Sequence, residues 1–193
     1  LDLSQSTNLK SLSCSFNQLT TLALSNAVSL ENLNCDSNHI LTLDASNLLN
    51  LKTLSCSKNT MTSLNINNAT LLETVDCDIN ALTVLDASNL VNLTALNCEK
   101  NLLTALSLAS SAPIKTLNCK TNNLSALNLS GLTSLETLDC SLNNISALDT
   151  TDLAQLKSLI CSDNEITSLN TANLANLETL KCNSNELTAL TIT

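Results

Sequence analysis

The chain has 193 residues, of which 45 are Leu and 29 are Asn, and its 8 Lys and 17 acidic residues give a net charge of −9. Trp, Tyr and Arg are absent and Gly and Pro occur once each, which excludes the glycine turns and aromatic cores of ordinary domains. A hydrophobic content of 44% excludes a disordered chain. The acidic balance argues against nucleic acid as a partner, because phosphate binding requires clustered cations. No run reaches the roughly 18 apolar residues of a membrane span, so we expect no membrane insertion.

A strict repeat runs along the whole chain, and its period is 21 residues. Its clearest marker is a column of nine cysteines: Cys14, Cys35, Cys56, Cys77, Cys98, Cys119, Cys140, Cys161 and Cys182. The third residue after each cysteine is an asparagine: Asn17, Asn38, Asn59, Asn80, Asn101, Asn122, Asn143, Asn164 and Asn185. Nine repeats begin at Leu9 and follow a partial repeat over 1–8, so we predict a single domain over 1–193. Neither end carries a recognisable cap, and we therefore expect a fragment of a longer protein.

Each repeat predicts one strand, followed by a return segment. The strands are expected around the apolar residue two places before each cysteine, in chain order Leu12, Leu33, Leu54, Val75, Leu96, Leu117, Leu138, Leu159 and Leu180. That residue and the cysteine point to one face of the strand, and their neighbours point to the other. Because a unit of 21 residues is too short for a long helix, the return should be extended. We expect second short strands at 43–45, 64–66 and 127–129, and a 3₁₀ turn near the nineteenth repeat position.

A known repeat pattern fits these units. The segments LETLDCSLNNI (135–145) and LKSLICSDNEI (156–166) match L-x-x-L-x-L-x-x-N/C-x-L, with cysteine in place of the third leucine. The chain resembles the leucine-rich repeat family, and its short units look most like repeats of bacterial surface proteins of the internalin-like group. The resemblance implies a leucine-rich-repeat solenoid of the right-handed β/α superhelix class, β-rich, with nine coils of 21 residues. It further implies a parallel sheet on the concave face, extended or 3₁₀ returns on the convex face, and a bacterial protein that is secreted or held at the cell surface.

The cysteine and asparagine columns favour structural roles. Equivalent Cβ atoms on adjacent strands lie about 4.8 Å apart, farther than the roughly 3.5–4.5 Å of a disulfide, and no closely spaced pair suits zinc. The cysteines are therefore predicted to be free thiols of a narrow core, unreactive in the native protein. Each asparagine amide can pair backbone groups at the turn after the strand, and losing a central one such as Asn101 should cost about 1–3 kcal/mol. We expect neither a metal nor a cofactor.

The second position of the repeat alternates in charge and is also interpreted as structural. It reads Lys10, Glu31, Lys52, Glu73, Thr94, Lys115, Glu136, Lys157 and Glu178. Stacking would place each Lys between Glu neighbours, which favours the correct register of the coils.

No enzyme signature is present, so we predict a non-enzymatic protein. His39 is the only histidine and has no partner at catalytic spacing, and Gly131 is the only glycine, which excludes a phosphate-cradling loop. The remaining candidate for function is the strand face that points away from the core, which repeat solenoids commonly use for partners.

Two groups of residues stand out on this face. Asp76, Asp78 and Glu99 form an acidic cluster on neighbouring strands that could attract a basic partner or a weakly held Ca²⁺. Apolar residues occupy nominally exposed positions, and lysines accompany them. The candidate partner-binding residues are Phe16, Asp76, Asp78, Ile79, Glu99, Lys100, Lys120, Leu142 and Ile160. A merely solvated face is the alternative, because the usual Trp, Tyr and Arg anchors are absent.

Two functions therefore stay open. The first is an interaction or adhesion module that binds a protein or glycan partner through the exposed sheet face. The second is a structural spacer or stalk, or a fibre that assembles end to end through uncapped termini, without a specific ligand.

Overall fold

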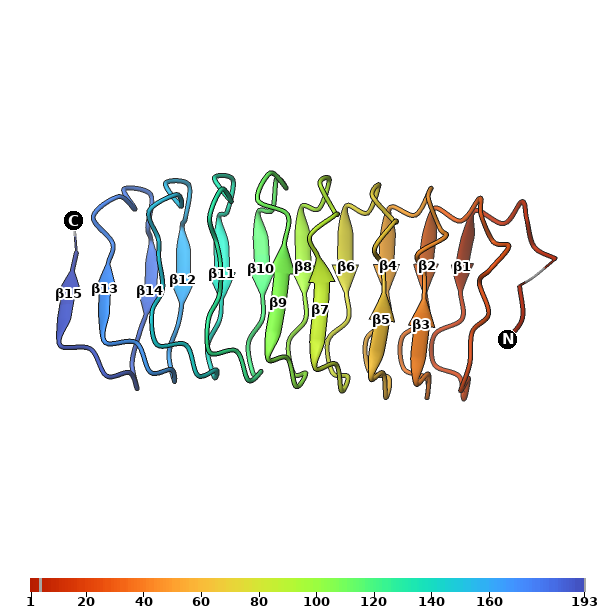
Figure 1. Ribbon diagram of the computed structural model, residues 1–193, viewed down its shortest axis with the longest axis horizontal. Helices are drawn as coiled ribbons and strands as arrows, with labels where there is room; N and C mark the ends of the chain where they lie inside the picture. Colours follow the sequence, from red (N-terminus) through yellow and green to blue (C-terminus); the bar gives the residue numbers. More distant parts are fainter. Residues whose placement is uncertain (4, 193) are drawn as a thin grey trace.

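The computed structural model describes residues 1–3 and 5–192 and shows a stack of similar coils (Figure 1). One strand of each coil joins a nine-stranded parallel sheet. In the order of the sheet these strands are β1 (Ser11–Ser13), β2 (Asn32–Asn34), β4 (Thr53–Ser55), β6 (Thr74–Asp76), β8 (Ala95–Asn97), β10 (Thr116–Asn118), β11 (Thr137–Asp139), β12 (Ser158–Ile160) and β14 (Thr179–Lys181). Paired residues lie 21 positions apart, as Leu117 does from Leu96 and from Leu138. The predicted solenoid with a parallel sheet is confirmed.

The opposite, convex side of the stack carries shorter and less continuous pairing (Figure 1). Its strands are β3 (Thr42–Asp44), β5 (Ser63–Asn65), β7 (Val84–Ala87), β9 (Ala105–Leu108), β13 (Ser168–Asn170) and β15 (Ala189–Thr191). They pair only as β3–β5, β7–β9 and β13–β15. The second strands expected at 43–45 and 64–66 are present within one residue, whereas the prediction of a strand at 127–129 is wrong.

The missing strand lies next to a shifted turn. In the β9 coil the turn bond runs from the Ala112 N–H to the Ala109 carbonyl (3.0 Å), one repeat position later than in the other coils. The Ser110 carbonyl then approaches Gly131 of the next coil so closely that a Cβ atom there would lie 2.5 Å from the Ser110 oxygen. Gly131 also has a φ of +78°, which favours glycine. The only glycine of the chain thus accommodates the shift, and the segment 127–129 that leads to it has no strand partner.

Two consecutive hydrogen-bonded turns close the return of most coils. In the first coil the Ala27 N–H donates to the Leu24 carbonyl (3.0 Å), and the Leu30 N–H donates to the Ala27 carbonyl (3.0 Å). The 3₁₀-type turn expected near the nineteenth repeat position is therefore present. Over residues 1–3 and 5–192 the structure contains no helix that is long and apolar enough to cross a membrane.

The core consists of stacked equivalent positions. The first, fourth, sixth, eleventh, fourteenth and sixteenth repeat positions supply buried residues, as predicted. A further buried column, which the sequence pattern does not reveal, occupies the nineteenth position: Ala27, Leu48, Ala69, Leu90, Leu132, Leu153 and Leu174. It lies at the double turn and closes the core on that side.

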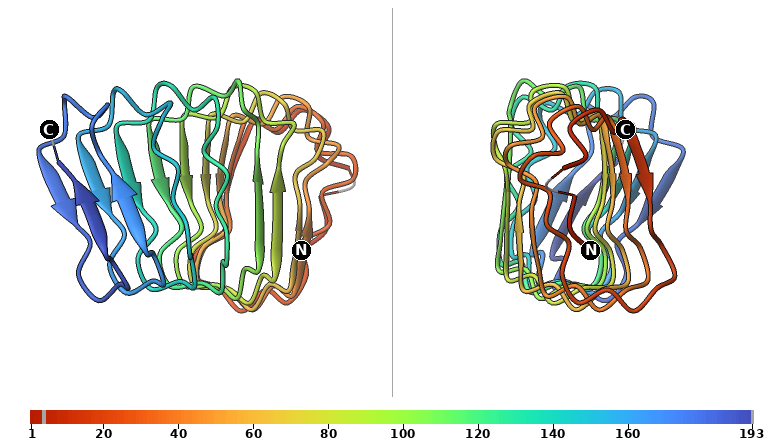
Figure 2. Two further views of the ribbon diagram at one scale, coloured as in Figure 1. Left: turned by 60° about the vertical axis from the view of Figure 1, so that its left-hand side comes forward. Right: turned by 90° about the vertical axis from the view of Figure 1, so that its right-hand side faces the viewer.

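The stack is twisted along its length. Figure 2 shows the blue strands of the C-terminal coils tilted relative to the green strands in the middle. Such rotation is expected when right-twisted strands stack. The outer face of the nine-stranded sheet is therefore one continuous, twisted surface.

Candidate functional site

The outer face of the nine-stranded sheet is hollowed over its first six strands. The hollow has a volume of about 710 Å³ and is lined by β1, β2, β4, β6, β8 and β10. The outward-pointing residues there are only Ser, Asn, Thr, Ala and Asp, for example Thr53 and Ser55 on β4. The larger Ile160 on β12 and Lys181 on β14 take the equivalent places farther along the sheet, and neither lines the hollow. We refer to this surface as the concave hollow.

The residue two places after each cysteine adopts a left-handed backbone conformation. These residues, with φ between 49° and 57°, are Phe16, Ser37, Lys58, Ile79, Lys100, Thr121, Leu142, Asp163 and Ser184. A residue other than glycine in this region costs roughly 1–2 kcal/mol. The conformation allows the N–H to pair with the next coil, as the Phe16 N–H does with the Asp36 carbonyl (2.9 Å). The side chains project from the margin of the sheet, where Phe16 is 83% exposed.

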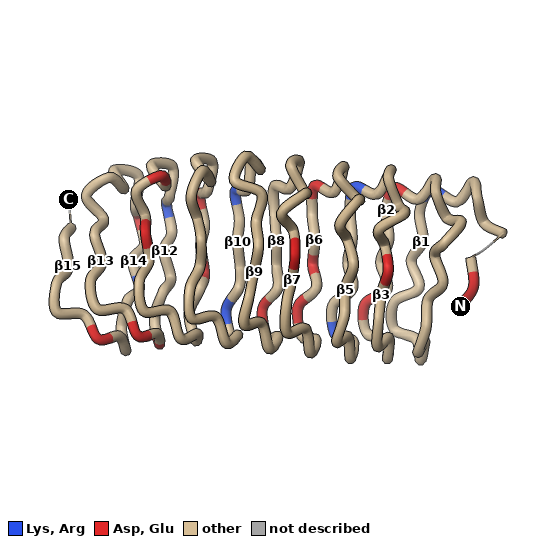
Figure 3. Tube along the Cα trace, viewed as in Figure 1, with Lys and Arg blue, Asp and Glu red and all other residues tan. Residues whose placement is uncertain are grey.

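A smaller hollow of about 180 Å³ adjoins the concave hollow at this margin. Phe16, Asp36, Ser57, Lys58, Asp76 and Asp78 line it, and Asp76 lines both hollows. We call it the acidic hollow, since acidic residues outnumber lysines here as along the whole stack (Figure 3). The structure thus brings together three predicted residues, Phe16, Asp76 and Asp78. Sequence reasoning missed Asp36, although it occupies the same repeat position as Asp78.

Neutral donors hold two of these carboxylates in place. Buried Ser57 links them, because its N–H donates to Asp36 Oδ1 (2.7 Å) and its hydroxyl donates to Asp76 Oδ1 (2.8 Å). The Ser55 hydroxyl donates to the other oxygen of Asp36 (2.6 Å), and Asn97 Nδ2 donates to Asp76 (3.0 Å). Neither these two carboxylates nor Asp78 forms an ion pair with any described residue. Their negative charge is therefore positioned but not neutralised.

The other predicted residues lie apart from the two hollows. Glu99 pairs with Lys100 (3.5 Å), so its charge is neutralised locally. The candidates that line neither hollow are Ile79, Glu99, Lys100, Lys120, Leu142 and Ile160. Within the described part of the chain, no three His, Cys, Asp or Glu side chains are grouped so that they could hold a metal ion.

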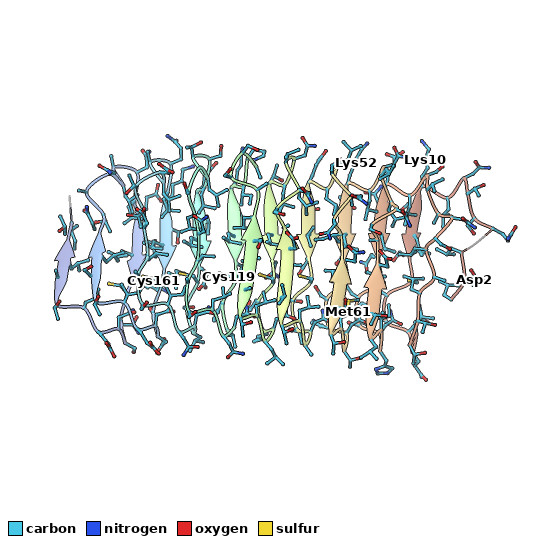
Figure 4. All side chains as sticks on the ribbon, viewed as in Figure 1. Asp2, Lys10, Lys52, Met61, Cys119 and Cys161 are labelled. Carbon is cyan, nitrogen blue, oxygen red and sulfur yellow. The ribbon has the colours of Figure 1, made fainter. Side chains whose placement is uncertain are left out.

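The cysteine column supplies no nucleophile. All nine cysteines are free thiols, and Figure 4 shows Cys119 and Cys161 inside the stack. Burial raises the pKa of Cys35, Cys119 and Cys161 to about 12, so these side chains stay protonated at neutral pH. Cys14 and Cys182, in the end coils, are partly exposed. The predicted lack of reactivity therefore applies to the seven buried thiols and not to these two.

The asparagine column pairs backbone groups between coils. Asn101 Nδ2 donates to the carbonyls of Cys77 (3.0 Å) and Cys98 (3.2 Å), and its Oδ1 accepts the Leu82 N–H (3.0 Å). Asn143 makes the equivalent three bonds in its own coil. These bonds fix the turn that carries the left-handed residues at the sheet margin.

The alternating charge column forms ion pairs along one edge of the stack. Glu31 pairs with both Lys10 and Lys52 (3.1 Å each), and Lys157 lies 2.6 Å from Glu136. Hydrogen bonds from the lysines lower the pKa of Glu31 and of Glu136. Figure 4 shows Lys10 and Lys52 at the same edge. None of these five residues lines either hollow, so the column is separate from the candidate site.

No family model matches the chain, and no curated protein matches it. Solved structures do share its fold. The functional domain of InlJ from Listeria monocytogenes, which includes a cysteine ladder, is 27% identical with a TM-score of 0.73, over 100% of this chain and 55% of that one. A leucine-rich repeat protein of Leptospira interrogans is 23% identical (TM-score 0.75, 99% of this chain and 62% of that one). The plant peptide hormone receptor RGFR1, in complex with RGF2, is 26% identical (TM-score 0.76, 95% and 33%). The chain spans less than two thirds of each of these structures.

Proposed function

Because this chain folds as a leucine-rich repeat solenoid, we propose that it is a non-enzymatic interaction module that binds a protein partner through the concave hollow. One neighbour with the same fold, RGFR1, is in complex with RGF2, which supports a binding role for such a scaffold. The protonated thiols of the core support the non-enzymatic part of the proposal, because they offer no ready nucleophile.

The observation that carries the proposal is the concave hollow itself. Its volume of about 710 Å³ falls within the roughly 300–1,000 Å³ that is typical of ligand sites. The core does not require short side chains on the outer face of the sheet, since these residues do not pack inward. Short Ser, Thr and Asn side chains leave the face accessible and supply hydroxyl and amide groups that pair with a polypeptide. The same groups suit sugar hydroxyls, so an adhesion module that binds a glycan is the finer alternative.

We propose further that the protein acts outside the cell, secreted or held at a bacterial surface. Support comes from the 27% identity to the InlJ domain of Listeria monocytogenes and from the cysteine ladder that the two share. Fractionation of the source cells, followed by detection with an antibody against this chain, should find it in the medium or accessible to added protease. Retention inside protease-treated intact cells would contradict this location.

A spacer or stalk is the second candidate function, and one observation favours it. The chain contains no Trp, Tyr or Arg, the residues that dominate most interface energies. A spacer would present the concave face to solvent without a specific partner.

Site-specific cross-linking separates the two candidates. A photo-reactive amino acid is placed at Thr74, exposed on β6 in the concave hollow, and in a matched variant at Ser63, exposed on convex β5. We expect a discrete protein adduct from position 74 alone when the protein is illuminated in its native surroundings. A carbohydrate adduct would instead identify the glycan alternative. The same adducts from both positions, or none from either, would favour the spacer.

A further inference from the structure

We propose that the partner segment in the concave hollow is a basic, extended peptide, with one Lys or Arg side chain in the acidic hollow beside Phe16. The inference rests on the proposed function, because it names the class of partner for the same face.

The concave hollow has the dimensions of an extended chain. Six stacked strands about 4.8 Å apart span about 24 Å, the length of about seven extended residues. Each strand contributes three residues, which gives the hollow a width of about 10 Å. A helix with its side chains, about 10–12 Å in diameter, would overfill that width, whereas a single extended chain fits.

Charge decides the chemistry of this peptide. Asp36, Asp76 and Asp78 meet at the margin of the hollow, and hydroxyl, amide and backbone N–H donors fix the oxygens of the first two. Lys58 is the one cation among the residues that line the acidic hollow, so an excess of negative charge remains there. Hydrogen bonds from Lys or Arg to positioned carboxylates are roughly twice as strong as neutral ones. The concave face is therefore complementary to a basic segment.

Phe16 is a second feature that points to the same ligand. It is the only aromatic residue of the chain, it is 83% exposed, and its φ is 55°. Neither burial nor backbone geometry explains a large apolar residue there, since Ser, Thr and Asp fill the same backbone position in other coils. An exposed ring beside carboxylates suits an ammonium or guanidinium group, which cation–π attraction draws to the ring face.

Fluorescence anisotropy with a labelled peptide of alternating Lys and Ser tests the charge preference. The reference peptide carries Glu in place of Lys. We expect the Lys peptide to bind and its affinity to fall with added salt, whereas the Glu peptide should not bind. Absence of saturable binding of the Lys peptide up to about 1 mM would overturn the proposal.

Two variants of equal charge locate the binding. The concave variant removes the three charges of the acidic hollow and is D36N/D76N/D78N. The convex variant removes three charges from carboxylates that each accept a backbone N–H two residues later, and it is D44N/D86N/D149N. Figure 3 shows acidic residues within β3 and β7 on that side. The concave variant should bind the Lys peptide about tenfold more weakly or worse, and the convex variant less than about twofold more weakly. Equal weakening would show diffuse attraction and overturn the proposal.

A single substitution keeps the test readable if the concave variant does not fold. Phe16→Leu retains an apolar side chain at an exposed position and removes the aromatic ring. It should weaken Lys-peptide binding about two- to fivefold. Ile79→Leu, at the same backbone position of another coil and outside the acidic hollow, is its control and should leave binding unchanged. Unchanged binding by Phe16→Leu would remove the ring from the site and overturn its assigned role.

The outcomes distinguish this inference from the proposed function. A Thr74 cross-link to a protein, together with no binding of the Lys peptide, would mean that the concave face takes a partner of another charge class. In that case the present inference fails alone. Absence of both the cross-link and the binding would overturn the proposed function as well.

Discussion

Replacing Asn101 by leucine tests how the coils are held together. Asn101 is 6% exposed, and its amide bonds three backbone groups on neighbouring coils. Leucine is of comparable size, so the substitution removes the hydrogen bonds while it keeps the space filled.

The three bonds do not contribute equally. The Leu82 N–H loses its acceptor inside the stack, which costs about 1–3 kcal/mol. The carbonyls of Cys77 and Cys98 each keep a bond from one further asparagine of the column, so each loses only a shared bond, about 0.5–1 kcal/mol. The free energy of unfolding should therefore fall by about 2–5 kcal/mol.

Urea titration followed by circular dichroism measures this change, and two variants control it. Asn17 is exposed in the first coil and donates within that coil to the carbonyls of Cys14 and Ser15 (3.0 Å each), so Asn17→Leu should cost less than half as much. Asn101→Asp keeps the acceptor for Leu82 but aims oxygen at two carbonyls, and it should also destabilise. If Asn101→Leu and Asn17→Leu lowered stability equally within about 0.5 kcal/mol, pairing between coils would not be what the amide contributes.

The remaining predictions concern the thiols, the glycine and the left-handed margin. A thiol reagent should modify Cys14 and Cys182 in the native protein and all nine cysteines after unfolding, and reaction of all nine in native buffer would contradict a buried column. Burial raises the pKa of the core thiols, so the free energy of unfolding should hold steady below about pH 8.5 and fall as pH rises above it; a flat alkaline profile in urea titrations would argue against this linkage. Gly131→Ala should lower stability by about 2 kcal/mol or more, because the new Cβ would meet the Ser110 oxygen at 2.5 Å where φ is +78°, and thermal melts would expose a neutral outcome. Phe16→Asn should raise the free energy of unfolding by about 0.5–1 kcal/mol, since little buried area is lost and left-handed strain is relieved; a decrease by urea titration would refute that reasoning.

Most of the fold is predictable because one coil is written many times. The cysteine at the sixth position identifies the buried face of each strand, as Cys98 does after β8. The asparagine three residues later marks the turn, as Asn101 does in the same coil. With the face, the turn and the period known, parallel stacking in register is the arrangement that buries every leucine column.

The site is less predictable, because it depends on geometry between coils. The left-handed conformation at Phe16 has no local sequence signal, since Ser, Lys, Ile and Thr also occupy that position; the bonds that close each turn impose it. Asp36 and Asp76 are 40 residues apart in the sequence and are linked only through Ser57. The extent of the concave hollow did have a signal, because the fifth repeat position stays short from Ser13 to Asn118 and becomes large only at Ile160.

Strain at the sheet margin shows where side-chain identity is free of folding constraints. Nine residues other than glycine in the left-handed region would together cost about 9–18 kcal/mol, as much as the roughly 5–15 kcal/mol of net stability of a typical protein. The asparagine bonds and strand ladders of the coils must offset this strain, because each coil gains stability only from its own contacts and its neighbours. Glycine or asparagine would relieve it and occurs at none of the nine positions. Folding therefore does not select the residues of this margin, and the margin beside the positioned carboxylates is where we place the binding chemistry.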